Sequence, residues 1–284
     1  MTLYPNASLA SGLEPAMSGE PRLDLVSWGV PFRLSAASDA LLGQMRERAP
    51  FGSKESHAPA SVAPTFTLRP TGSEPRYRLL ADDRLLIEDQ PLESSLLQLG
   101  AHLMVHVAES APDYVFVHAG VVAWQDRALV LPGVSHAGKS TLVAELVRAG
   151  ATYYSDEFAL LDRDGRVHPF TRTLQMRRPG RLEQTPLPLA QINGRAGTGA
   201  LAVSLVVFTE FAEGARWAPE ALAPGHAVLE LLPHTIPTQR TPARVLSTLA
   251  ATLRPATAWR SKRGEAPETA RALFAALATG GTLA

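Results

Sequence analysis

Hydrophobic positions in residues 111–284 change period from one segment to the next, which predicts alternating strands and helices. Short continuous apolar runs rich in β-formers predict strands, and apolar residues three or four apart predict helices. The segments predicted in this way are strands at 114–124, 128–133, 151–162 and 201–211, an extended segment at 167–177, and helices at 138–150, 243–253 and 267–278. Polar turns are expected at 125–127 and 163–166, and Gly150 lies where a helix C-cap is expected. The strand at 201–211 is the last strong one by pattern.

The first part of the chain has weaker patterning. It predicts a strand-like segment at 23–36 interrupted by Gly29 and Pro31, a loop or linker at 49–64, strands at 65–70 and 76–89 with a turn at 81–83, and a helix at 96–108. We therefore expect a flexible leader at 1–22, a small α+β N-terminal portion at 23–110 and an α/β catalytic domain at 111–284.

Composition and charge restrict the function classes. The 27 Lys and Arg residues balance 27 Asp and Glu residues, so a general affinity for nucleic acid is not expected. The absence of cysteine excludes disulfides, cysteine-ligated metals and thiol catalysis. The chain has neither an apolar run of the roughly 18 residues that span a bilayer nor the basic start and apolar core of a signal peptide. A cytoplasmic protein without a membrane partner is the expectation.

A phosphate-binding motif follows the strand at 128–133. The segment reads Gly133, Val134, Ser135, His136, Ala137, Gly138, Lys139, Ser140, Thr141, and its first eight residues match G-x-x-x-x-G-K-[ST]. The glycines let backbone N–H groups turn inward around phosphate oxygens, and the helix that follows adds its positive N-terminal end. Lys139 is then expected to reach the β- and γ-phosphates, and the Ser140 hydroxyl to ligate Mg²⁺. The motif therefore predicts that the domain binds ATP with Mg²⁺.

An acidic pair, Asp156 and Glu157, comes only one helix and one tight turn after Ser140. If 151–162 is one strand, the two side chains point to opposite faces of the sheet. This strand is the next one after the helix, so it could lie beside the strand at 128–133. One carboxylate could hold Mg²⁺ and another could accept a proton from an attacking hydroxyl.

His118 lies one strand before the phosphate-binding motif. A path of strand, turn and strand could place its ring near the motif, where it could contact a phosphate or the substrate hydroxyl. The alternative is a histidine that is hydrogen-bonded at a strand end for structural reasons. The sequence alone excludes neither of these two interpretations of His118.

Three segments together resemble the catalytic domain of HPr kinase/phosphorylase and its relatives: VHAGVV (117–122), GVSHAGKSTL (133–142) and RAGATYYSDEFALLD (148–162). The resemblance covers residues 114–162 and implies the phosphoenolpyruvate-carboxykinase-like P-loop fold. It also implies that Lys139 and Ser140 are the phosphate and Mg²⁺ ligands and that Asp156 activates the substrate serine. Glu157 takes the place of the acidic neighbour of that residue, and His118 that of the histidine before the P-loop.

The chain also departs from that family. His136 replaces the usual glycine, and no segment matches the Glu-x-Arg-Gly-Leu-Gly signature linked to phosphorylase activity. The chain is more similar to divergent HPr-kinase-related proteins, some of which are associated with modification of ribosomally made peptides. The expected function is an ATP-dependent serine kinase acting on a protein or on such a precursor peptide. The alternatives are a small-molecule kinase and a nucleotide-binding regulatory protein with little turnover, and any of them could be a homo-oligomer.

Several basic residues further along have two interpretations. Arg172 or Arg177 could neutralise the transferring phosphate, and the segment at 261–265 could be a basic loop near the substrate. Surface charge is the simpler interpretation for all of them, and His234 is expected to be structural.

Overall fold

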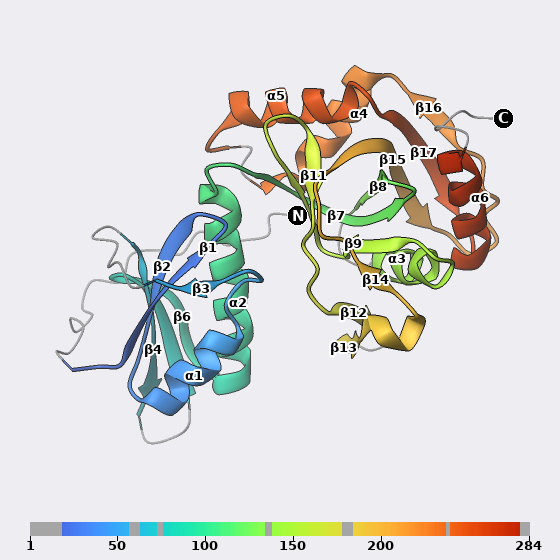
Figure 1. Cartoon of the computed structure of the whole chain (residues 1–284). Coiled ribbons are helices and arrows are strands. Elements are labelled where there is room, and N and C mark those ends of the chain that lie inside the picture. Colours follow the sequence, from blue (N-terminus) through green and yellow to red (C-terminus); the bar gives the residue numbers. More distant parts are fainter. Residues whose placement is uncertain are drawn as a thin grey trace. The chain divides into compact units, whose positions relative to one another are not determined.

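The computed structural model describes residues 19–56, 63–72, 76–133, 138–177, 184–236 and 239–278 (Figure 1). Most of the leader predicted at 1–22 lies outside these residues, and so do Val134, Ser135, His136 and Ala137 of the phosphate-binding motif. The chain divides into two compact units, Met1–Pro112 and Asp113–Ala284, each of which is described by itself.

The N-terminal unit is a six-stranded sheet with strand order β3-β1-β2-β4-β5-β6. Its strands are β1 (Arg22–Ser27), β2 (Val30–Ala36), β3 (Lys54–Glu55), β4 (Thr65–Thr71), β5 (Arg76–Ala81) and β6 (Arg84–Pro91). Only the pair β2 and β4 is parallel among these neighbours. Helices α1 (Asp39–Glu47) and α2 (Leu92–Ser110) contact each other, while α1 contacts β2 and α2 contacts β5 and β6, so both cover one face of the sheet.

Two features of this unit differ from the sequence-based expectation. The segment at 23–36 is a hairpin, because Trp28 and Gly29 both adopt positive φ between β1 and β2, whereas Pro31 lies inside β2. Helix α1 was not predicted. Ser38 caps it by accepting a hydrogen bond from the Leu41 backbone N–H at 3.3 Å, and the short helix buries only Leu41 and Met45.

The C-terminal unit contains a nine-stranded sheet and a separate hairpin. The sheet consists of β7 (Val115–Trp124), β8 (Arg127–Pro132), β9 (Thr152–Ser155), β10 (Phe158–Leu161), β11 (Arg166–His168), β14 (Arg195–Ala196), β15 (Leu201–Phe211), β16 (Glu220–Leu222) and β17 (Thr257–Arg263). The hairpin is β12 (Leu174–Arg177) with β13 (Gln184–Leu187). The helices are α3 (Lys139–Arg148), α4 (Pro224–Leu231), α5 (Pro242–Leu253) and α6 (Ala266–Ala278), with 3-10 turns η1 (Leu189–Ile192) and η2 (Leu232–His234).

Alternating side chains of the strands build two hydrophobic cores in this unit. Val121 and Val130 face one core, which contains side chains of α4 and α5. Val122 and Leu129, their neighbours in sequence, face the other core, which contains side chains of α3 and α6. Since successive side chains of a strand point to opposite faces, the sheet lies between two helical layers. Figure 1 shows the two helix pairs on these different sides of the sheet.

Strand pairing sets the position of the phosphate-binding motif. β8 is parallel to β15, and β15 is parallel to β17, so the carboxyl ends of these strands lie at one edge of the sheet. The pairings also form a closed ring through β7, β10, β11, β15 and β8. β17 follows the strand predicted to be the last strong one. In its sequence TAWRSKR only Ala258 and Trp259 are apolar, and the polar Ser261 and Arg263 are nevertheless buried.

The expected position of the acidic strand beside the motif's strand is wrong. β7 lies between them, pairing with β8 along one side and with β9 and β10 along the other. β9 and β8 are both antiparallel to β7, so they run in the same direction. The end of β9, where the acidic pair follows, therefore lies at the same edge as the end of β8.

Gly165 lies in the turn between β10 and β11, at a position where a larger residue should be poorly tolerated. Its φ is +77°, and a Cβ there would overlap the backbone of Ala251 and Thr252 in α5. We expect Gly165→Ala to lower the free energy of unfolding by at least about 2 kcal/mol, because it adds a backbone clash to the strain of a left-handed conformation. Gly214→Ala is the matched control, with φ +72° and nothing within 4 Å of the added atom. Urea unfolding that shows equal losses for both variants would contradict this packing.

Candidate functional site

The junction of β8, the phosphate-binding motif and α3 forms the base of the candidate site. Gly133 follows β8, and Gly138 is the N-cap of α3 with φ 75° and ψ 17°, a left-handed conformation that glycine adopts without strain. The Lys139 ammonium is buried and donates a hydrogen bond to the Gly133 carbonyl oxygen at 2.7 Å. A buried ammonium beside a helix N-terminus provides positive charge where phosphate would bind.

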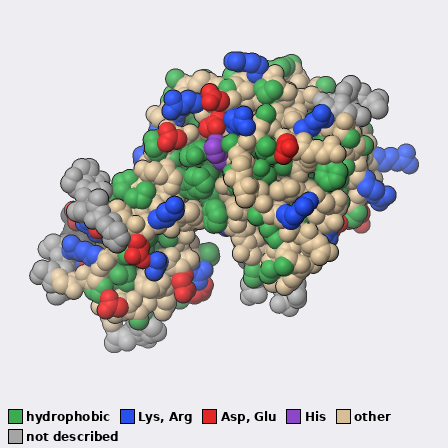
Figure 2. Space-filling view, in the orientation of Figure 1, with side chains coloured by type: hydrophobic (Ala, Val, Ile, Leu, Met, Phe, Trp, Pro, Cys, Tyr) green, Lys and Arg blue, Asp and Glu red, His purple; other side chains and the backbone are tan. Residues whose placement is uncertain are grey.

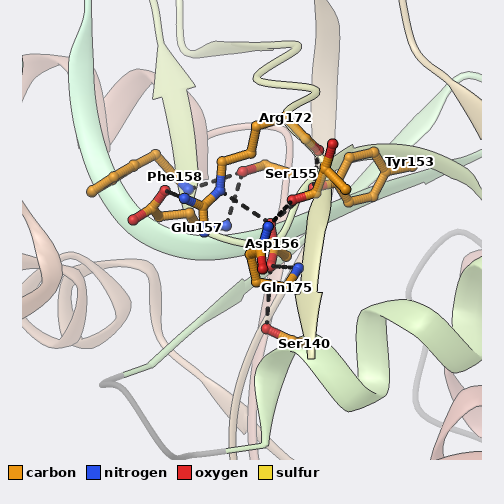
Figure 3. A network of polar contacts seen from close by, with 9 residues as sticks. Ser140, Tyr153, Ser155, Asp156, Glu157, Phe158, Arg172 and Gln175 are labelled. Atoms are coloured by element: carbon orange, nitrogen blue, oxygen red, sulfur yellow. Dashed lines mark hydrogen bonds and ion pairs between the residues drawn. The ribbon is translucent and has the colours of Figure 1, made fainter. Parts of the chain in front are cut away.

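Ser140 and Asp156 meet at the start of α3. The Ser140 hydroxyl lies 3.3 Å from Asp156 Oδ2, which also accepts a hydrogen bond from the Gln175 backbone N–H at 3.1 Å. Asp156 Oδ1 accepts a hydrogen bond from the Tyr153 hydroxyl at 2.8 Å. Figure 3 shows Asp156 at the centre of these contacts, with Ser140 reaching it from α3. Of the three residues predicted from the sequence as candidate Mg²⁺ ligands, Ser140, Asp156 and Glu157, the structure thus brings the first two into direct contact.

The predicted strand at 151–162 is broken where its chemistry lies. Asp156 and Glu157 form a bend between β9 and β10, because the Ser155 hydroxyl oxygen accepts hydrogen bonds from the backbone N–H groups of Glu157 and Phe158 at 3.0 and 2.9 Å. The expectation that the two carboxylates point to opposite faces is therefore wrong. Both contact one guanidinium instead, that of Arg172.

Arg172 is part of this cluster and not a surface charge. Its Nη1 lies 2.7 Å from Glu157 Oε2, and its Nε lies 3.6 Å from Asp156 Oδ1. Its backbone carbonyl also accepts a hydrogen bond from the Tyr153 hydroxyl at 3.0 Å. Burial raises the pKa of Glu157, Arg172 opposes this rise, and the neighbouring Asp156 adds to it. Arg177 ends β12, and its side chain lies outside the described part of the structure.

His118 lies beside the motif through its backbone. Its carbonyl accepts a hydrogen bond from the Gly133 N–H at 3.3 Å, and its ring centroid lies 5.7 Å from that of Phe158. Burial lowers the pKa of His118 to about 3, with further lowering by the charges of Lys139, His234 and Arg172. Burial followed by Lys139 lowers the pKa of His234 as well. His118 is therefore a neutral imidazole at neutral pH. It can donate or accept a hydrogen bond, but it has no positive charge that would attract a phosphate.

The depressed pKa of His118 predicts a loss of stability in acid. The unfolded chain takes up a proton near pH 6.5 and the folded chain only near pH 3, so the stabilisation is complete above pH 6.5 and is lost as pH falls toward 3. The slope is up to about 1.4 kcal/mol per pH unit. The urea midpoint of the parent should fall between pH 7.5 and 5.0 by more than that of His118→Asn. Equal falls in the two proteins would contradict a half-buried, neutral His118.

A cavity of about 1020 Å³ adjoins the motif at the ends of the parallel strands. Pro132 and Gly133 line it from β8, Phe208–Phe211 from β15 and Arg260–Lys262 from β17. Ligands of α/β sheets bind beyond the carboxyl ends of parallel strands, and this volume suits a small molecule or a peptide segment. His234, the last residue of η2, lines the same cavity and therefore adjoins the site.

No family model and no curated protein matches this chain.

Other features of the described residues limit what those residues can bind. They contain no group of three or more His, Asp or Glu side chains that could hold a metal ion by themselves. A Mg²⁺ ion that takes one or two protein oxygens and completes its shell with phosphate and water does not need such a group.

No described helix is long and apolar enough to cross a membrane. On the face of the C-terminal unit shown in Figure 2, basic and acidic side chains are interspersed, unlike the basic stripe of a nucleic-acid site.

Sequence reasoning missed three contributors to the site. Tyr153 and the backbone of Gln175 hold Asp156, and neither was assigned a role from the sequence, although Tyr153 lies in the segment 148–162. Arg263, in the segment at 261–265 interpreted as surface charge, is 2% exposed and donates to the Gly138 carbonyl from 125 residues away. The four consecutive polar residues that end β17 give no sequence signal for the burial of Arg263, which depends on the pairing of β17 with β15.

Proposed function

We propose that this protein is an ATP-dependent serine kinase that transfers the γ-phosphate of ATP to a hydroxyl of a protein or peptide. One observation carries the proposal: the Ser140 hydroxyl and the Asp156 carboxylate lie 3.3 Å apart at the N-terminus of α3, next to the buried ammonium of Lys139. A hydroxyl and a carboxylate at a phosphate-binding helix are the ligands of Mg·ATP in phosphotransferases. The resemblance of residues 114–162 to HPr kinase supports the same assignment.

The residues present fit Mg²⁺, which prefers oxygen ligands. Ser140 Oγ and Asp156 Oδ2 would hold the ion, which when bound neutralises phosphate charge. Lys139 would bind the β- and γ-phosphates, and the amides at the start of α3 would donate to phosphate oxygens.

Transfer of the phosphoryl group forms a bond between the acceptor hydroxyl oxygen and the γ-phosphorus, and it breaks the bond between that phosphorus and the oxygen bridging to the β-phosphate. ADP leaves, and the acceptor proton passes to a base. We assign that base to Asp156, which the resemblance also implies, through Oδ1, because Oδ2 is the oxygen that faces Ser140 and would hold the ion. Arg172 is assigned a charge-neutralising role. Glu157 is the alternative base, because burial raises the pKa of its carboxyl group.

The cavity beside Gly133 favours a second candidate, a kinase that phosphorylates a small hydroxylated molecule. A volume of about 1020 Å³ with polar and apolar lining can enclose such a molecule. The catalytic residues would be the same, and only the acceptor would differ.

Labelled ATP separates these candidates. The full chain would be incubated with [γ-³²P]ATP, Mg²⁺ and, in separate reactions, serine-containing peptides encoded by neighbouring genes or a pool of small alcohols. We expect label on a peptide serine, located by mass spectrometry. Label on a small alcohol alone would favour the second candidate. ATP binding without transfer to any acceptor would contradict a kinase and favour a nucleotide-binding regulatory protein.

A further inference from the structure

The buried guanidinium of Arg263 contacts the phosphate-binding motif, although Arg263 lies 125 residues after Gly138 in the sequence. Arg263 is the last residue of β17 and 2% exposed. Its Nη2 donates to the Gly138 carbonyl at 3.0 Å and its Nη1 to the Gly264 carbonyl at 2.9 Å, while its Cζ lies 5.3 Å from the ring centroid of Phe211. Arg263 therefore connects the ends of β15 and β17 to the start of α3.

The positive charge of this guanidinium is only partly offset by its neighbours. Among the described residues its Nη atoms donate only to backbone carbonyls, and its Nε has no hydrogen-bond partner there. Burial lowers the pKa of Arg263, a shift that Glu265 opposes, yet a guanidinium stays protonated at neutral pH. A buried cation whose partners are two carbonyls and one ring is costly, and an anion nearby would offset that cost.

The contact with Gly138 also fixes the direction of one amide. The Gly138 carbonyl accepts hydrogen bonds from Arg263 and from the Leu142 backbone N–H, the latter at 3.2 Å. Because a trans peptide is planar, the N–H of Lys139 points away from that carbonyl, out of the N-terminus of α3. Gly138 has to be glycine for this approach, since a Cβ at that position would overlap the Arg263 guanidinium.

We propose that Arg263 is a positioning residue for a nucleoside polyphosphate, holding the peptide between Gly138 and Lys139 so that its N–H faces the phosphates. Its charge adds to that of Lys139 at the same junction. Binding of the polyphosphate thereby depends on β17, a strand outside the phosphate-binding motif. This inference rests on the proposed function, because it needs the motif to bind phosphate.

The test compares Arg263→Met with the parent and with Arg127→Met. Arg127 is the matched control because its guanidinium also donates to a distant carbonyl, that of Leu277, but from the first residue of β8, at the end away from the motif. Dissociation constants would be measured by calorimetry for Mg·ATP and for Mg·pyrophosphate, which has no base or sugar. We expect both constants to rise about tenfold or more in Arg263→Met, since a charge-assisted contact is lost, and to stay within about twofold in Arg127→Met.

A merely structural role would lower the thermal midpoint without changing these constants in the folded protein. Binding of both ligands by Arg263→Met within about twofold of the parent would overturn the inference while leaving the kinase proposal intact. If the parent binds neither ligand, the proposed function fails, and the inference fails with it. If Arg263→Met does not fold, Arg263→Lys decides the question. Lysine keeps the charge but lacks the planar fork whose Nη1 and Nη2 reach the two carbonyls, so weaker binding of pyrophosphate is expected, and unchanged binding would overturn the inference.

Discussion

Asp156→Asn is expected to lower the rate of phosphate transfer by about 10²- to 10⁴-fold, the usual contribution of a general base. Asparagine has nearly the same shape and can still accept the hydrogen bond of the Tyr153 hydroxyl, which lies 2.8 Å from Asp156 Oδ1. The amide cannot take up the proton of an attacking hydroxyl. The rate would be measured in single-turnover reactions with [γ-³²P]ATP at saturating acceptor, enzyme and Mg²⁺, so that weaker binding of Mg·ATP by the variant does not lower it.

Glu157→Gln is the control for this variant, because Glu157 is the adjacent carboxylate and contacts the same guanidinium of Arg172 at 2.7 Å. We expect Glu157→Gln to retain a larger share of the parent rate. Transfer at the parent rate by Asp156→Asn, together with a large loss in Glu157→Gln, would assign the base to Glu157 and contradict the role given to Asp156.

Lys139→Ala is expected to weaken ATP binding about 10- to 100-fold and to lower transfer as well. The ammonium is buried and donates to the Gly133 carbonyl at 2.7 Å, so its removal takes away a positive charge that is already positioned beside the motif. Binding of a fluorescent ATP analogue would be measured by anisotropy. Lys54→Ala is the control, since Lys54 is an exposed residue of the N-terminal unit. Unchanged affinity in Lys139→Ala would remove the motif from the nucleotide site.

Sequence periodicity predicted the elements that build the cores of the C-terminal unit. The helix expected at 138–150 is α3 at Lys139–Arg148, and the strand expected at 201–211 is β15 with the same bounds. These segments are long and regular in apolar spacing, which is where pattern carries most information. The short elements α1, α4 and β16 were missed because each is too short for a clear periodic pattern and buries two side chains or fewer.

The arrangement of the site depended on features that local pattern does not contain. The bend at Asp156 and Glu157 arises from the Ser155 hydroxyl, which competes for backbone N–H groups that a regular strand would pair. The position of β7 between β8 and β9 is a matter of long-range pairing. Arg263 comes to the motif only because β17 is parallel to β15, and no residue near the motif in sequence indicates this. Roles for Lys139, Ser140 and Asp156 were predicted from the motif, its spacing and the resemblance, whereas the contact between Ser140 and Asp156 was not.

The dependence of ATP binding on Mg²⁺ tests the central claim most directly, because it needs no acceptor. Calorimetric titrations of the full chain with ATP would be run with Mg²⁺ and with EDTA, on the parent, on Ser140→Ala and on Asp156→Asn. Since Ser140 Oγ and Asp156 Oδ2 lie 3.3 Å apart, we expect Mg²⁺ to strengthen ATP binding by the parent about tenfold or more and to have little effect in either variant. Absence of saturable ATP binding by the parent, or the same gain from Mg²⁺ in all three proteins, would contradict a Mg·ATP site at the start of α3.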